Sequence, residues 1–83
     1  MWEGHVDNFI VFLRSQGLVA TSIRTKRNHV LQLARAFPDI PPTELDPGSL
    51  VEWCGTRAWA NETRHAYYST FRRFFGWLDS RHH

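Results

Sequence analysis

The stretch from Trp59 to Leu78 reads WANETRHAYYSTFRRFFGWL, and the spacing of its apolar residues decides the fold class. Read as a helix at about 100° per residue, the stretch divides into two faces. One face is aromatic and aliphatic, and consists of Tyr67, Tyr68, Phe71, Phe74, Phe75 and Leu78. The opposite face is polar, and consists of His65, Ser69, Arg72 and Gly76, with Arg73 beside them. The stretch predicts an amphipathic helix with an aromatic core face, and its polar face is either solvated surface or a binding surface.

Three earlier segments have the same helical spacing of apolar residues. We predict helices over about 2–16, 21–37, 47–56 and 61–80. The residues expected to face inward from the first three are Trp2, Val6, Phe9, Ile10 and Leu13; Ile23, Val30, Leu33, Ala34 and Phe37; and Leu50, Trp53 and Cys54. No segment alternates in the manner of a strand. The sequence therefore predicts an all-α fold, a compact four-helix bundle.

Several residues indicate where the predicted helices begin and end. Gly17 is expected to end the first helix. Thr21 or Ser22 is expected to cap the second helix, because either hydroxyl can accept from free backbone N–H groups. Asp46 is expected to cap the third helix, with Pro47 at its first position, where the missing N–H costs nothing.

The chain of 83 residues fits one domain, residues 1–83. Its single cysteine, Cys54, cannot form an internal disulfide, which fits the reducing cytoplasm. No apolar run reaches the roughly 18 residues that span a membrane, so no membrane partner is expected. His5, His29 and His65 lie on separate predicted helices without the paired spacing of metal ligands, and His29 is expected beside the core. We expect no metal, no cofactor, no catalytic residue and no enzymatic activity.

The net charge of +2 hides an uneven distribution of charge along the chain. Residues 20–37 contain four basic residues and no acid, and residues 57–78 contain four arginines and one acid. Residues 38–56 contain four acids and no base. Two basic segments and one acidic segment predict a polarised surface whose positive face attracts a polyanion, of which nucleic acid is the commonest.

The sequence resembles the core-binding domain of tyrosine recombinases, the phage integrase family, over nearly its whole length. WANETRHAYYSTFRRFFGWL resembles the last helix of that domain. ATSIRTKRNHVLQLARAF is similar to its second helix, although Lys26 stands where the family often has an aromatic residue. TELDPGSLVEW is similar to the linker and third helix that come next in the family.

The resemblance implies a SAM-like helical domain that clamps duplex DNA together with a separate catalytic domain of the full-length chain. That catalytic domain is absent from this sequence, so the chain would bind DNA without cutting it. Helices two and four would face the major groove. Further partners would be other recombinase protomers, and the protein would be encoded by a bacterium or phage and lie in the cytoplasm with the nucleoid.

The expected DNA-binding residues fall into three groups by chemistry. Positive side chains would neutralise phosphates, and these are Arg24, Arg27, Arg35, Arg64, Arg72 and Arg73. Residues near helix starts would offer hydroxyls and backbone N–H groups, and these are Thr21, Ser22, Thr25 and Thr63. Amide, imidazole and hydroxyl groups would reach base edges, and these are Asn28, His65 and Ser69.

Two other classes of protein remain open at this point. A protein-interaction module would dock a partner on an apolar patch, for which Val11, Phe12 and Trp77 lie off the main apolar stripes. A helix-turn-helix regulator is less favoured, because the connector PDIPPTEL is too long and too rich in proline. His82 and His83 carry no functional weight in either interpretation.

Overall fold

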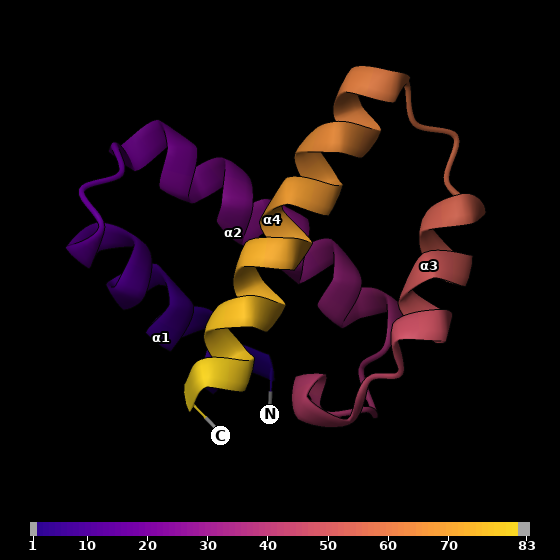
Figure 1. Ribbon diagram of the computed structural model, residues 1–83, viewed down its shortest axis with the longest axis horizontal. Coiled ribbons are helices and arrows are strands. Elements are labelled where there is room, and N and C mark those ends of the chain that lie inside the picture. The colour runs from indigo at the N-terminus through magenta and orange to yellow at the C-terminus, as the bar shows by residue number, and fades with distance from the viewer. Residues whose placement is uncertain (1, 82–83) are drawn as a thin grey trace.

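Residues 2–81 are described by a computed structural model, and all regular structure in this part of the chain is helical (Figure 1). The elements in chain order are α1 (Trp2–Ser15), α2 (Ala20–Ala36), the short 3-10 helix η1 (Pro42–Glu44), α3 (Pro47–Gly55) and α4 (Asn61–Arg81). Each α-helix begins and ends within one residue of its predicted boundary. The all-α class and the set of four helices are therefore confirmed for residues 2–81. His82 and His83 lie outside the described residues.

Helix α4 lies at the front of the molecule in Figure 1 and separates the other elements. The helix α1 and the first half of α2 lie to its left, while η1 and α3 lie to its right. Helix α2 packs against both α1 and α4 and passes behind α4. The Cα radius of gyration is 12.3 Å, close to the roughly 12 Å of a compact domain of this length.

The core lies where α1 and α4 bring their aromatic faces together. Phe9 and Phe74 are both fully buried, and their rings meet edge to face with centroids 5.1 Å apart. The Trp2 indole Nε1 donates hydrogen bonds to the carbonyls of Phe37 and Ile40, each at 2.9 Å, which ties the start of α1 to the end of α2. Every residue predicted to face inward is buried or half-buried, so the predicted core faces are confirmed.

The predicted N-terminal capping residue is confirmed for α3 and wrong for α2. Asp46 caps α3 as predicted, because its Oδ2 accepts from the Ser49 backbone N–H at 3.2 Å and Pro47 occupies the first turn. The predicted cap of α2 is wrong: the helix begins earlier, at Ala20, and its N-cap is Val19, which makes no side-chain cap hydrogen bond. Thr21 and Ser22 therefore lie inside the first turn of α2.

The early start of α2 results from how α1 ends. Gly17 has the positive φ of 79° that favours glycine, and it reverses the chain as predicted. The Leu18 backbone N–H bonds back to the Leu13 carbonyl at 3.4 Å, and the Leu18 side chain packs on the core. Val19 is then extended and α2 begins directly, which leaves no room for a hydroxyl at the cap position.

Four of the eight acidic residues lie on the side of α4 away from the first half of α2. Asp39, Glu44, Asp46 and Glu52 are all exposed, and they lie in the connector, η1 and α3. Within residues 2–81, no helix is long and apolar enough to cross a membrane.

Candidate nucleic-acid interface

A polar cavity of about 280 Å³ lies between the first half of α2 and the middle of α4. Small side chains of α4, at Ala66, Ser69 and Thr70, face α2 at this level and leave the space between the two helices unfilled. The polar cavity is lined by Thr21, Ser22, Thr25, Lys26, His29, Ala66, Ser69 and Thr70. Four of the predicted DNA-binding residues, from two helices, thus line one hollow that contains no carboxylate.

His29 is buried at the side of the polar cavity, as expected for a residue beside the core. Its exposed fraction is 9%, and its Nδ1 lies 2.8 Å from the Thr70 Oγ1. When the Thr70 hydroxyl donates its only hydrogen to the Ala66 carbonyl, at 3.1 Å, the imidazole Nδ1 is the donor of the shorter bond. The ring also stacks on Tyr67 with centroids 4.0 Å apart, and Tyr67 stacks on Trp59 at the same separation.

Two positive side chains, Lys26 and Arg73, lie close to each other where α2 meets α4. Burial, and next the charge of Arg73, lower the pKa of Lys26. Burial, and next the charge of Lys26, lower the pKa of His29. His29 is therefore neutral at pH 7, with its proton on Nδ1. Lys26 has no hydrogen-bond or ion-pair partner within residues 2–81, so its charge is available to a ligand.

A second hollow, of about 460 Å³, lies between the end of α1 and the start of α2. Its lining includes three arginines, Arg14, Arg24 and Arg27. Arg14 was not among the residues predicted from the sequence, because it stands alone in an otherwise acidic first helix. Its place in the last turn of α1, just before a short link to α2, was the available signal. The tertiary structure adds Arg14 to the basic residues predicted on α2.

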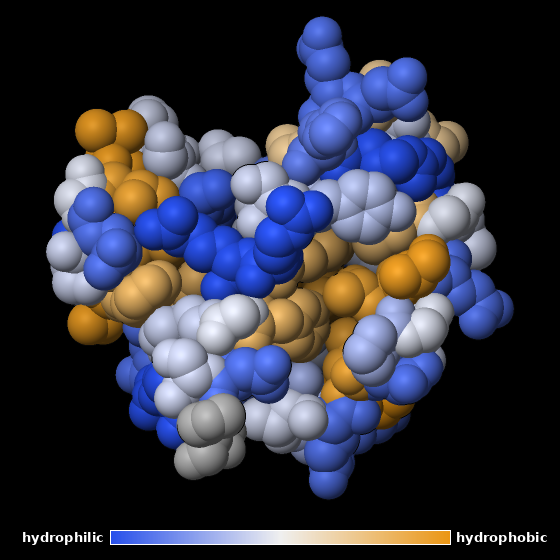
Figure 2. Space-filling model, in the orientation of Figure 1, coloured by the Kyte–Doolittle hydropathy of each residue, from blue (hydrophilic) through white to orange (hydrophobic). Residues whose placement is uncertain are grey.

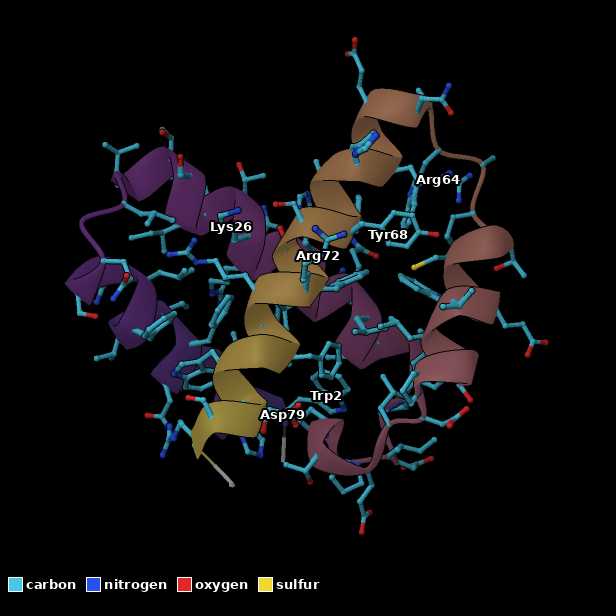
Figure 3. All side chains as sticks on the ribbon, in the orientation of Figure 1. Trp2, Lys26, Arg64, Tyr68, Arg72 and Asp79 are labelled. Carbon is cyan, nitrogen blue, oxygen red and sulfur yellow. The ribbon has the colours of Figure 1, made fainter. Side chains whose placement is uncertain are left out.

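Arg72 and Arg73, in the middle of α4, are both exposed. Figure 3 shows Lys26 and Arg72 at the front of the molecule, one on each helix of the crossing. Arg73 points toward α1, with its Cζ 5.9 Å from the centroid of the Phe12 ring. His65, Asn28 and Ser69 are exposed, as expected for residues on the polar faces of their helices. Figure 2 shows the corresponding band of strongly hydrophilic residues across α2 and α4.

Three of the predicted residues do not join this face. Arg64 is half-buried and donates to the Cys54 and Arg57 carbonyls at 2.8 and 3.1 Å, so its guanidinium caps the end of α3 (Figure 3). Arg35 lies at the far end of α2, in a hollow that it shares with Trp2 and Glu3. Thr63 is exposed in the first turn of α4 and lines none of the hollows described here.

An apolar groove of about 620 Å³ lies on the other side of α4, against η1 and α3. Its lining includes Tyr68, Phe71 and Phe75 from α4 and Leu50 and Val51 from α3. Arg72 and Asp79 also line it. Figure 2 shows hydrophobic residues gathered on this side of α4.

In the apolar patch expected around Val11, Phe12 and Trp77, the side chains of Phe12 and Trp77 pack against the core. The rings of Phe12 and Trp77 stack on each other with centroids 6.0 Å apart, and both pack beside Phe9. Val11 alone of the three is largely exposed, at 62%. The apolar groove is therefore a further candidate surface for docking a protein.

Comparisons of the chain with models of protein families, with curated proteins and with solved structures gave no match. Among the described residues, no group of three or more histidine, cysteine and acidic side chains is placed to hold a metal ion. Cys54 is buried and its pKa is raised, chiefly by that burial, so its thiol is protonated at neutral pH.

Proposed function

We propose that this protein binds duplex DNA along the joined basic faces of α2 and α4, as the SAM-like core-binding domain of a tyrosine recombinase. One observation carries the proposal: α2 packs against α4 and their exposed faces form one hydrophilic band, while the four acids of residues 38–56 lie on the other side of α4. The family resemblance of the sequence supports the same pair of helices. The compartment that fits this function is the cytoplasm, with the nucleoid.

The division of roles depends on the chemistry of the side chains. Arg24, Arg27, Lys26, Arg72 and Arg73 would neutralise phosphates, which supplies affinity without sequence information. Arg14 would extend this set from α1. Asn28, His65 and Ser69 stand exposed beside these cations and would reach base edges. Strand cleavage would belong to a separate catalytic domain, and other protomers would complete the assembly.

A titration with duplex DNA at several salt concentrations tests the proposal. About four to six phosphate contacts would give a log–log slope of roughly −4 to −5, because each neutralised phosphate releases counterions. We expect weak binding at low salt that disappears steeply as salt rises. No binding at low salt, or an affinity that does not change with salt, would overturn the proposal.

Docking of a protein in the apolar groove is the second candidate, favoured by the exposed Val51 (62%) in its lining. Such docking depends on apolar burial, so it would persist as salt rises, whereas binding to phosphates would not. The same salt series therefore distinguishes the two functions.

A further inference from the structure

The polar cavity has the chemistry of an anion site, and its role in this protein rests on the proposed binding of DNA. Two of its hydroxyls already donate within the protein: Thr25 donates to the Thr21 carbonyl at 3.0 Å, and Thr70 to that of Ala66. The hydroxyls of Ser22 and Ser69, one on each helix, have no partner within residues 2–81. They are free to donate to a ligand in the cavity.

Lys26 supplies the charge that an anion requires. Its side chain is half-buried in the wall of the cavity, and no acidic side chain is part of the lining. A partly desolvated ammonium group without a counterion is destabilised, and an anion in the cavity would relieve that cost. The first turn of α2 adds to this, because its backbone N–H groups have no side-chain cap.

His29 offers a further donor, which depends on pH. Its Nδ1 is already bonded to Thr70, and its Nε2 has no hydrogen-bond partner within residues 2–81. No buried side-chain nitrogen or oxygen in this part of the chain lacks a partner, so Nε2 is accessible to solvent. His29 is 9% exposed and is part of the lining of the polar cavity, so Nε2 is the ring nitrogen that remains for a ligand.

We propose that the polar cavity binds one phosphate group between Lys26 and the hydroxyls of Ser22 and Ser69, and that His29 takes up a proton at Nε2 and donates it in a hydrogen bond to this phosphate. The cavity, at about 280 Å³, is much larger than the share of one water molecule, roughly 30 Å³. In the proposed DNA complex, the group is one phosphodiester of the backbone, which lies along the α2–α4 crossing.

The groups that face His29 determine the sign of this proton linkage. They are Lys26 from α2 and Tyr67 and Thr70 from α4, and Tyr67 in turn stacks on Trp59 from the loop before α4. In the free protein, burial and the positive charge of Lys26 keep the imidazole neutral. A bound phosphate adds negative charge beside Lys26 and an acceptor for Nε2–H, so the pKa of His29 rises on binding.

Linkage then requires that DNA binds more tightly as the pH falls. Each unit by which binding raises the pKa of His29 corresponds to about a tenfold gain in affinity once the pH is below the free value. We expect a gain of about threefold to tenfold in affinity between pH 7.5 and pH 5.5. The phosphodiester itself does not titrate in this range, so the change belongs to the protein.

NMR titration of the histidine rings tests the proposal directly, with the full chain free, with a DNA duplex and with inorganic phosphate alone. We expect the pKa of His29 to rise with the duplex, and the amides of Ser22 and Ser69 to shift. The ring signals of His5, on α1, serve as an internal control. If inorganic phosphate also raises the pKa of His29, the cavity recognises the phosphate group itself. If only the duplex raises this pKa, the DNA backbone is needed to position the phosphate in the cavity.

Two variants separate this site from the rest of the DNA surface. His29→Gln keeps a donor for Thr70 but cannot titrate, so the affinity of this variant for DNA should rise less than that of the wild type between pH 7.5 and pH 5.5, and an equal rise would contradict the site. Lys26→Gln should lower the salt slope by about one, while the matched change Arg57→Gln, on the side of α3, should leave it unaltered.

The outcomes distinguish this inference from the proposed function. If the duplex binds with the expected salt slope but the pKa of His29 stays the same with both ligands, the phosphate site is wrong and DNA binding stands. If the duplex does not bind at low salt, the proposed function fails. In that case the titration with inorganic phosphate still tests the cavity. An unchanged pKa of His29 would overturn the phosphate site, and a raised pKa would support it.

Discussion

The two sides of α4 face hollows of opposite chemistry. Toward α2, the small residues Ala66, Ser69 and Thr70 leave a polar cavity with one lysine and one histidine. Toward α3, Tyr68 and Phe75 instead line an apolar groove. At about 100° per residue the two sets lie on nearly opposite sides of α4, so the position of a residue around one helix decides whether it lines a hollow for an anion or one for an apolar group. Residue size on α4, as well as charge, therefore decides what each side can bind.

The largest expected effect comes from Phe71→Ala, which removes a side chain that is 2% exposed and lines the apolar groove. Large-to-small changes of this kind cost about 3–5 kcal/mol, much of the stability of a small domain. Thermal or urea unfolding measures the loss. Val51→Ala, on the exposed wall of the same groove, is the control and should change stability by less than about 0.5 kcal/mol. A melting temperature of Phe71→Ala equal to that of the wild type would contradict the position of the core.

Arg64→Ala tests the contrast between the two sides of α4, because Arg64 belongs to the α3 side. Its loss removes two hydrogen bonds, to the Cys54 and Arg57 carbonyls. At about 0.5–1.5 kcal/mol for each bond, we expect a loss of roughly 1–3 kcal/mol in the free energy of unfolding, with an unchanged salt slope for DNA. Urea unfolding and a salt series measure the two quantities. If the stability were unchanged and the salt slope for DNA fell by about one, Arg64 would contact a phosphate, as the sequence predicted, and would not cap α3.

Arg24→Ala and Arg72→Ala test the basic surface itself. Both side chains are exposed, so stability should change by less than about 0.5 kcal/mol. Each should weaken DNA binding for all sequences and reduce the salt slope by about one, as expected for a phosphate contact. Arg57→Ala is the matched control on the α3 side. If Arg72 instead reads a guanine, discrimination at one base position should fall by about 1–3 kcal/mol.

The smallest expected effect is on the stability of the free protein between pH 7.5 and pH 5.5. Because the folded state lowers the pKa of His29 below 6.5, the unfolded chain binds more protons as the pH falls through that value. The contribution of neutral His29 is therefore complete above pH 6.5 and is lost below it. Urea unfolding at the two pH values should show lower stability at pH 5.5. The His29→Gln variant should show a smaller difference, and an equal difference would mean that another group is responsible.

Much of the fold could be predicted because the signals that define it are local. The spacing of apolar residues within one helix reports its buried face, so the inward-facing residues of all four helices were found correctly. Asp46 and Pro47 identified the start of α3, since a cap and its helix lie within a few residues of each other. His29 was placed beside the core by the same spacing.

Contacts between elements could not be predicted from the sequence. Arg64 lies among the basic residues of its helix, and only the position of α3 shows that its guanidinium caps that helix. Arg14 is isolated in the sequence, and only the packing of α1 on α2 shows that it lies near Arg24 and Arg27. The cap of α2 was wrong because the tight turn at Gly17 leads directly into the helix from an apolar residue, Val19.

The order of residues along the chain was enough to establish the helices, their core faces and the separation of basic from acidic segments, because each depends on residues that are near in the chain. Which polar faces share a surface, and where hollows remain, depends instead on tertiary packing. The polar cavity needs small residues on α4 opposite Lys26 and His29 on α2. That juxtaposition depends on the angle and level at which two helices cross, which the packing of the whole core sets.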